Sequence, residues 1–203
     1  MIMVVLALRV FRQIKKLSVK NNLHMREESV QEQRNKEGLT GILEEDFHRI
    51  KQLFEGAGDF AYRKIEINAA YSAVILFLNG LVNVERMELH VIHPLLKANE
   101  KLPRHAEITI DDMKGVLSSA QVRQGDTFQE VIDQILAGGT ILLMNGSTRA
   151  LFISEQAWEQ RSVDEPLSEA VVLGPREGFT ENIRTNASMI RRRLKTTKLK
   201  FEY

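Results

Sequence analysis

Two short apolar runs, each closed by an Asn-Gly pair, constrain the fold of this chain most strongly. Residues 75–80 read ILFLNG and residues 141–146 read ILLMNG. Short β-rich runs that end in a turn pair indicate buried strands more than helices. The second run continues through Asn145 and Gly146 into another β-rich stretch, STRALFIS, which predicts a hairpin whose turn needs positive backbone angles. The chain is therefore expected to build its core around buried strands.

The first run lies in a segment with an α-β-β-α pattern. Helical spacing of apolar residues predicts a helix over residues 42–54, which ends at a pair of glycines. Residues 60–67 alternate in polarity and residues 71–78 are apolar, so both are predicted strands. Residues 84–96 are expected to form an apolar-rich helix, interrupted at Pro94 because proline has no N–H to donate.

The second run lies in a segment with its own helix and strand signals. Thr127 is a predicted helix cap for residues 128–136, because Glu130 follows three positions later as in a capping box. The segment begins with the apolar residues Ile108, Met113, Val116 and Leu117, and a possible strand, AQVRQ, follows them before that cap. The predicted hairpin and a C-terminal basic helix follow it.

The fold class predicted from these patterns is α/β. We expect two small α/β subdomains joined by a linker, with mixed sheets packed by amphipathic helices. Residues 39–98 form the first subdomain, residues 99–106 the polar linker around Pro103, and residues 107–203 the second subdomain. The likeness of the two apolar runs, with four of six positions identical, favours this division over one continuous sheet, although chance explains the likeness itself.

Residues 1–38 are predicted to be a leader outside the folded body. Its first eight residues, MIMVVLAL, are far fewer than the ~20 needed to span a bilayer. They also lack the basic region that precedes a signal-peptide core. Two alternatives remain open here: a poorly ordered leader, or a basic amphipathic helix that lies on a membrane or partner.

Charge is distributed unevenly although the net charge is only +1. Residues 1–26 hold six basic residues and no acid, and residues 184–203 hold seven basic residues and one acid. The remaining middle holds 15 basic and 26 acidic residues. Basic ends around an acidic body suit an anionic membrane surface or nucleic acid, and they are equally typical of solvated tails.

The sequence offers no support for enzyme, metal or nucleotide chemistry. The absence of cysteine excludes disulfides, thiolate zinc sites and a cysteine nucleophile. His90 and His93 are one helical turn apart, but no third ligand accompanies them, so we predict no metal and no cofactor. No serine lies in a G-x-S-x-G frame and no glycine-rich loop ends in G-K-[ST]. We therefore predict that the chain is not an enzyme.

The C-terminal stretch GPREGFTENIRTNASMIRRR, residues 174–193, combines a sharp corner with an amphipathic helix. We expect Thr180 to cap the helix and Glu181 to lie in its first turn. Arg176 and Glu177 are expected to join a structural ion-pair network. One helix face is predicted to be apolar and the other basic; the apolar positions are Ile183, Ala187, Ile190 and Leu194.

Residues 164–194, DEPLSEAVVLGPREGFTENIRTNASMIRRRL, resemble the hallmark of the A subunit of bacterial spore germination receptors, the GerA family. The resemblance covers the chain from about Phe47 to its C-terminus, and residues 1–38 lie outside it. The positions that carry it are Glu165, Pro166, Glu169, Gly174, Pro175, Arg176, Glu177, Gly178, Phe179, Thr180, Glu181, Thr185, Asn186, Ile190, Arg191, Arg192 and Arg193. Family members continue into membrane-spanning helices, so this chain is expected to be the N-terminal soluble domain of such a subunit.

The resemblance implies a place and partners that the composition alone does not. Complete receptors of this kind lie in the spore inner membrane, contain A, B and C subunits, and respond to nutrients. The implied partners are the transporter-like B subunit, the C subunit and further A subunits, an anionic membrane surface, and a small nutrient germinant such as an amino acid or sugar; nucleic acid is not implied. This domain is expected on the cytoplasmic side, facing the spore core.

Two hypotheses for the domain follow from this resemblance. The first is a scaffold and signal-coupling domain whose basic helix docks against a partner or the membrane. The alternative is a sensor domain that binds a germinant in a cleft between the two subdomains, although no cluster of aromatic and polar residues marks a pocket. Under the first hypothesis, changing Arg191, Arg192 and Arg193 together to Ala is expected to weaken receptor assembly or germination without disturbing the isolated fold.

Overall fold

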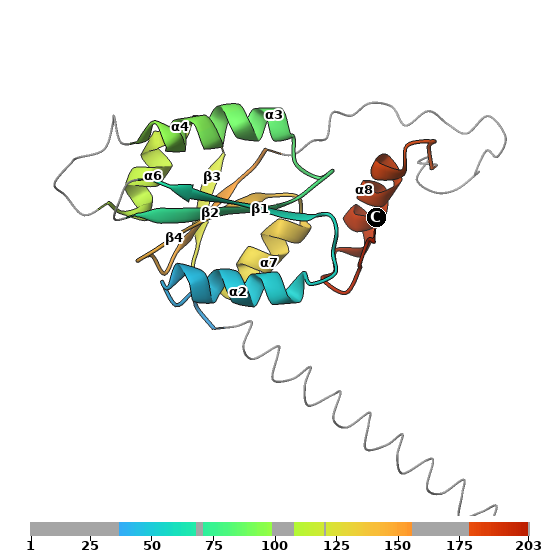
Figure 1. Ribbon diagram of the computed structural model, residues 1–203, viewed down its shortest axis with the longest axis horizontal. Helices are drawn as coiled ribbons and strands as arrows, with labels where there is room; N and C mark the ends of the chain where they lie inside the picture. The colour runs from blue at the N-terminus through green and yellow to red at the C-terminus, as the bar shows by residue number, and fades with distance from the viewer. Residues whose placement is uncertain (1–36, 68–70, 99–107, 120, 156–178, 203) are drawn as a thin grey trace, which may run out of the picture. The chain divides into compact units, whose positions relative to one another are not determined.

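The computed structural model of the protein (Figure 1) describes residues 37–67, 71–98, 108–119, 121–155 and 179–202. One compact unit comprises residues 38–203, and residues 1–37 form a separate unit. Near the start of the compact unit, Leu39 donates its N–H to the carbonyl of Asp126 at 2.9 Å. The prediction for the leader lies almost wholly outside the described residues.

A single five-stranded sheet forms the centre of the described fold. Its strands lie in the order β1-β2-β4-β5-β3, and every neighbouring pair is antiparallel. The strands are β1 (Phe60–Glu66), β2 (Ser72–Leu78), β3 (Val122–Gly125), β4 (Thr140–Met144) and β5 (Ala150–Ile153). The predicted α/β class is confirmed.

The two predicted subdomains share this sheet, which corrects the prediction of separate mixed sheets. Strand β2 from the first segment pairs directly with β4 from the second, with Ala73 opposite Met144 and Leu76 opposite Ile141. Residues 73–78 of β2 are apolar and buried, as is typical of a strand covered on both faces, and β2 pairs with its second neighbour across the predicted boundary. The predicted linker around Pro103, across which the alternative hypothesis placed the germinant, lies outside the described residues.

Helices cover both faces of the sheet and make two hydrophobic cores (Figure 1). Helices α2 (Leu43–Leu53) and α7 (Phe128–Leu136) cover one face, where Phe47 and Phe128 pack with even-numbered residues of β2. The other face is covered by α3 (Val84–Met87), the π-helical turn η1 (Glu88–Ile92), α4 (His93–Leu96) and α6 (Ile110–Val116). Because successive strand residues point to opposite faces, one apolar strand supplies both cores.

The helix predicted over residues 84–96 is present as α3, η1 and α4 in succession. The π turn lies just before Pro94, which cannot donate to the carbonyl of His90. That carbonyl instead accepts the N–H of Ser118 at 3.1 Å, so the expected interruption is repaired by the segment after α6.

The Asn145-Gly146 pair ends β4 as predicted, in a longer connection than a two-residue hairpin. Ser147 donates to the carbonyl of Met144 at 3.2 Å, and Gly146 has φ +83°, while Asn145 keeps a negative φ. The side chain of Asn145 accepts the N–H of Leu43 at 3.3 Å and so caps α2, whose own N-cap residue Ile42 has no side-chain acceptor. The turn therefore also fixes the start of α2, which lies 102 positions earlier in the sequence.

Candidate interaction site around the C-terminal helix

The C-terminal helix α8 (Ile183–Leu194) begins two residues later than predicted. Asn182 is its N-cap, and the side chain of Asn182 accepts the N–H groups of Arg184 at 2.9 Å and Thr185 at 3.3 Å. Thr180, the predicted cap, instead accepts the N–H of Asn182, and Glu181 lies before the helix and not in its first turn. Threonine and asparagine side chains can both cap a helix, so the spacing alone did not decide between Thr180 and Asn182.

The Thr180 segment is held against the helix by Asn186. The N–H of Thr180 donates to Oδ1 of Asn186 at 2.8 Å, and Nδ2 of Asn186 donates to the carbonyl of Thr180 at 2.7 Å. One amide side chain thus satisfies both backbone groups of a residue before the helix. Asn186, the asparagine of the Thr-Asn pair, therefore has a structural role: it fixes the position of Thr180 just before α8.

Arg191 joins α8 to the rest of the domain through a buried ion pair. Its Nε donates to Oδ2 of Asp59 at 2.9 Å and its Nη2 donates to Oδ1 at 2.6 Å. Arg191 is 0% exposed and Asp59 is 4% exposed. Two parallel, charge-assisted hydrogen bonds satisfy the carboxylate, and removing either partner would leave a buried charge uncompensated.

The chain after α8 completes the surroundings of this ion pair. Lys195 ends the helix at φ +40°, and Nη1 of Arg191 donates to the carbonyl of Thr196 at 2.9 Å. The ring of Phe201 lies 5.1 Å from the Arg191 guanidinium, and the carbonyl of Phe201 accepts the N–H of Gly58 at 2.9 Å. Arg191 therefore positions both the helix and the segment that follows it, close to the start of β1.

Lys200 lies close enough to the ion pair to be affected by its charges. Its ammonium group donates to the carbonyl of Leu53 at 3.0 Å. Partial burial lowers the pKa of Lys200, and the nearby positive charge of Arg191 lowers the pKa further. A change in the Arg191 contact should therefore be visible in the titration of Lys200.

The face of α8 that packs differs from the predicted one. Ala187, Met189 and Arg191 are buried, whereas Ile183 is 71% exposed and Leu194 is 56% exposed. None of these residues belongs to either hydrophobic core. Of the four positions predicted to share an apolar face, Ala187 is buried, Ile190 is half-buried, and Ile183 and Leu194 are exposed, because the buried ion pair turns Arg191 inward.

A second close contact accompanies the ion pair. Gly80, the glycine of the first Asn-Gly pair, has φ +87°, and a β-carbon built there would lie 3.5 Å from Cβ of Ser188 on α8. The end of β2 and the middle of α8 are therefore neighbours in space. Glycine suits this position mainly because of its backbone angle.

The predicted motif residues fall into two groups. Those from Glu165 to Gly178, including the expected Arg176 and Glu177 network, lie outside the described residues. Phe179, Glu181 and Arg193 are exposed, and Thr180, Thr185, Asn186, Ile190 and Arg192 are half-buried. The three consecutive arginines thus have different surroundings, and because Arg191 is buried we now expect the triple change to Ala to disturb the fold as well.

Asp59 is the member of this candidate site that the sequence pattern did not indicate. It follows two glycines and precedes β1, which is an ordinary setting for a solvated turn carboxylate. Its partner Arg191 lies 132 positions away along the chain. No local signal in the sequence identifies such a pair. Neither an acid beside a predicted strand nor an arginine inside a predicted helix indicates a buried ion pair when each is considered alone.

Other candidate chemistry finds little support in the described residues. His90 is half-buried and His93 is exposed, and no three His, Asp or Glu side chains gather there as metal ligands. Within that same part of the chain, no helix is both long enough and apolar enough to cross a membrane.

Comparison with known proteins gives a consistent set of relatives. Residues 48–203 match the family described as Bacillus/Clostridium GerA spore germination protein. The chain is 28% identical over 159 residues to the uncharacterised membrane protein YfkQ of Bacillus subtilis (strain 168), covering 78% of this chain and 30% of YfkQ. It is 30% identical over 165 residues to the spore germination protein GerLA of Bacillus cereus, covering 81% of this chain and 33% of GerLA. The chain therefore spans about a third of the length of these curated relatives.

A solved structure has the same fold. The N-terminal domain of the A subunit of the Bacillus megaterium spore germinant receptor GerK3 matches with a TM-score of 0.63 at 23% identity. The match covers 83% of this chain and 61% of that one. At this level of identity the similarity establishes the fold.

Proposed function

Because the chain belongs to the Bacillus/Clostridium GerA spore germination protein family, we propose that it is the N-terminal signal-coupling domain of a germinant receptor A subunit. In this proposal the domain lies on the spore-core side of the inner membrane, next to the B and C subunits. It forms a rigid sheet-centred body, and α8 is the movable element through which that body and the rest of the receptor affect each other.

The observation that carries this proposal is the buried ion pair between Asp59 and Arg191. Helix α8 buries Ala187, Met189 and Arg191, and none of these residues belongs to either hydrophobic core. Removing either partner of a buried charge pair is strongly destabilising, so we expect α8 to adopt a distinct second arrangement when the pair is broken. A two-position element of this sort is what signal coupling requires.

The ion pair is also well placed to pass on a shift of α8. Asp59 immediately precedes β1, and its carbonyl accepts the N–H of Asn79 at 2.8 Å, just beyond β2. A displacement of Arg191 would therefore act on the ends of two paired strands. Through them it reaches the helices on both faces of the sheet.

The test is germination of spores whose receptor A subunit carries Arg191→Lys. Lysine retains the charge but cannot make two parallel hydrogen bonds to one carboxylate. We expect germination in response to nutrient to slow by about 5–150-fold, the range that coupling free energies of about 1–3 kcal/mol produce. Loss of optical density measures the rate, and immunoblotting measures receptor abundance.

Arg184→Lys is the matched control, because Arg184 is on the same helix and is exposed. It should germinate at the normal rate. If Arg191→Lys spores contain normal amounts of receptor and germinate as fast as the Arg184→Lys control, the coupling proposal is wrong.

A further inference from the structure

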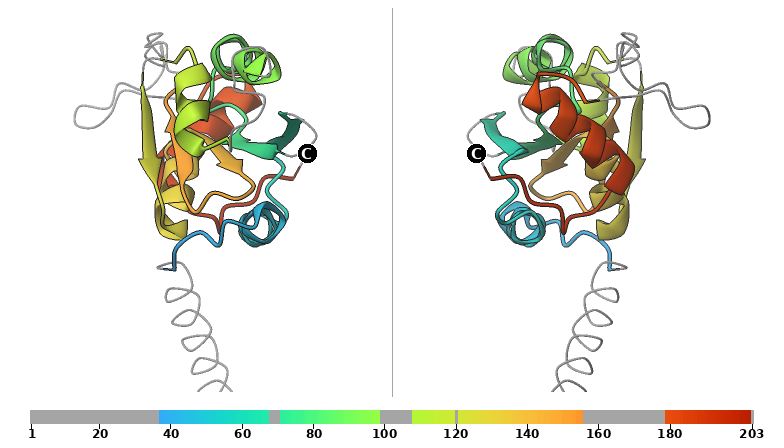
Figure 2. Two further views of the ribbon diagram at one scale, coloured as in Figure 1. Left: turned by 90° about the vertical axis from the view of Figure 1, so that its left-hand side faces the viewer. Right: turned by 90° about the vertical axis from the view of Figure 1, so that its right-hand side faces the viewer.

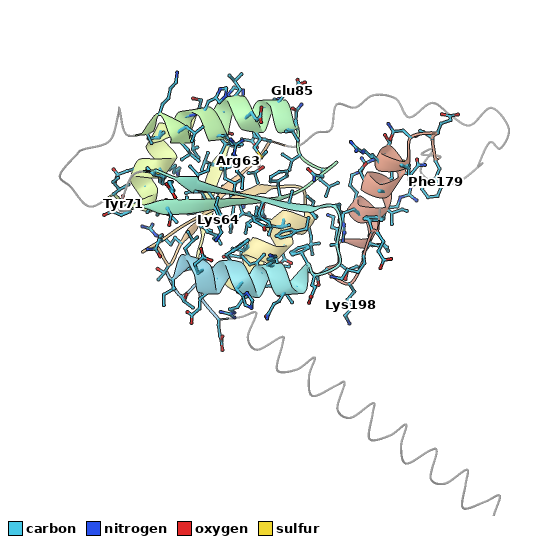
Figure 3. All side chains as sticks on the ribbon, in the orientation of Figure 1. Arg63, Lys64, Tyr71, Glu85, Phe179 and Lys198 are labelled. Carbon is cyan, nitrogen blue, oxygen red and sulfur yellow. The ribbon has the colours of Figure 1, made fainter. Side chains whose placement is uncertain are left out.

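The outward face of α8 carries an apolar stripe that the described part of the domain leaves uncovered. Ile183 and Leu194 are 11 positions apart, close to three helical turns, so they lie on the same face, with the half-buried Ile190 between them. Phe179, just before the helix, is 71% exposed. Figure 2 shows α8 lying across the outside of the domain in its right-hand view, and Figure 3 labels Phe179 before the helix and Lys198 after it.

Positive charge borders this stripe. Arg184, Arg193 and Lys195 are exposed on or next to α8, and Lys198 is exposed after it. Residues 179–202 contain seven basic residues and two acids, Glu181 and Glu202. Arg191 faces inward to Asp59, whereas Arg184 and Lys195 are exposed beside the stripe, so positive charge lies on the outer side of this segment.

From these observations we propose that the outward face of α8, defined by Phe179, Ile183, Ile190 and Leu194 with the cations Arg184 and Lys195, docks onto an anionic lipid bilayer. Aliphatic and aromatic side chains bordered by Lys and Arg are the composition that binds in the plane of a membrane interface. An anionic surface attracts the cations, and the apolar side chains enter the boundary between headgroups and acyl chains. This inference rests on the proposed function, in which α8 is the coupling element.

The same molecule contains a useful counterexample. The helix from α3 to α4 also exposes apolar side chains, with Leu89 60% exposed, but the exposed acids Glu85 and Glu88 lie beside it. The basic residue Arg86 is also exposed there, and Arg63 pairs with Glu88 at 3.8 Å, so acidic and basic side chains are mixed around Leu89. Leu89 therefore provides a control that matches Ile183 in size and is similarly exposed, but has no excess of positive charge beside it.

The experiment measures binding of the full 203-residue chain to sedimenting lipid vesicles. One set is pure phosphatidylcholine and the other contains about one third phosphatidylglycerol, which supplies the negative surface potential. Residues 1–26 are also basic, and their contribution stays the same in every variant. The variants are Arg184→Gln with Lys195→Gln, Ile183→Ala with Leu194→Ala, and the control Leu89→Ala.

We expect each cation removed to weaken binding to anionic vesicles by about fivefold, which corresponds to about 1 kcal/mol per residue near the surface. The Ile183→Ala and Leu194→Ala pair should weaken it by about tenfold or more, because several buried CH₂ groups are lost. Leu89→Ala should bind like the unchanged chain. Unchanged binding in either α8 variant, or an equal loss in Leu89→Ala, would overturn the lipid proposal.

The two proposals fail in different ways. If the α8 surface variants bind vesicles normally but their spores germinate slowly, α8 docks on an acidic protein and not on lipid, and the coupling role stands. If the surface variants lose vesicle binding while Arg191→Lys spores germinate normally, the lipid surface stands as a binding property and the coupling role is wrong.

Discussion

Helices α7 and α8 are both amphipathic, but they attach to the domain in opposite ways. Helix α7 buries five apolar side chains in one core: Phe128, Val131, Ile132, Ile135 and Leu136. Helix α8 is longer, yet it buries only an alanine, a methionine and an arginine. Its largest aliphatic side chains face outward.

The comparison shows that the period of a sequence predicts a helix without predicting which side of it docks. Burial of an apolar stripe decides the orientation when a sheet face is available to cover it, as for α7. At α8 a single desolvated ion pair decides the orientation, because a buried Asp59 without Arg191 would cost more than exposing two aliphatic side chains. An apolar stripe that remains outside is then available for another partner.

The largest expected effect tests the strength of the α7 attachment. Phe128→Ala removes a ring that is 1% exposed and that the Arg49 guanidinium covers at 4.4 Å. The cavity and the lost burial should reduce the free energy of unfolding by about 3–5 kcal/mol. Urea denaturation measures this loss. Phe179→Ala, next to α8, is the matched control and should change the free energy of unfolding by less than about 0.5 kcal/mol. Similar losses in both variants would contradict the conclusion that α7 is the more strongly attached helix.

A somewhat smaller effect is expected when the ion pair of α8 is broken. Arg191→Met leaves Asp59 buried without a partner and should cost about 3 kcal/mol or less, since the charge can regain water once α8 separates from the body. Hydrogen exchange should accelerate in the amides of α8 while those of α7 stay protected. The pKa of Lys200 should rise towards its ordinary value, because a neighbouring positive charge is lost.

The double variant Asp59→Leu with Arg191→Met provides the control for that change. Removing both charges together should recover most of the lost stability, because no buried charge remains. If α7 and α8 exchange at equal rates in Arg191→Met, then α8 is part of the main cooperative unit, and the contrast between the two helices is wrong.

The helix caps provide a finer comparison. Thr127→Ala removes the hydroxyl that accepts the N–H of Glu130 at 3.2 Å and should lower global stability by about 1 kcal/mol. Asn182→Ala removes an equivalent cap from α8 and should affect hydrogen exchange in α8 far more than the midpoint of denaturation. Equal shifts of the midpoint in both variants would show that the two helices unfold together.

The smallest effect is expected on the outer face of α8. Ile183→Ala should change the free energy of unfolding by less than about 0.5 kcal/mol, because this side chain is largely in water. Ile135→Ala, the same substitution in α7 at a position that is 0% exposed, should cost about 2–5 kcal/mol. Thermal denaturation of the two variants side by side measures the difference, and a loss above about 1 kcal/mol at Ile183 would mean that the stripe is covered.

Local signals in the sequence predicted most of the individual elements. The capping box of Thr127 and Glu130 is present in the structure, and both predicted strands of the first segment begin and end within a residue or two of β1 and β2. These features depend on neighbouring residues, so a local pattern contains the information. The capping box of Thr109 and Asp112 at α6 depends on the same signal and was missed.

Features that depend on distant residues were not predictable in the same way. The pairing of β2 with β4 cannot be predicted from composition, because several strands are similarly apolar. The similarity of residues 75–80 and 141–146 favoured two separate units, whereas these two strands are neighbours in one sheet. The burial of Arg191 depends on Asp59 in the other half of the chain. Family resemblance identified the C-terminal stretch without revealing which of its arginines faces inward.

The position of β2 between β1 and β4 has a consequence for the newly made chain. Ala73 pairs with Met144, 71 positions later, and at a ribosomal rate of about 5–20 residues per second the delay is about 4–14 s. Through that interval β2 has one neighbour at most, and its second hydrogen-bonding edge is open along an apolar strand. We therefore expect the nascent chain to be most prone to aggregation, and most dependent on chaperones, between the synthesis of β2 and that of β4.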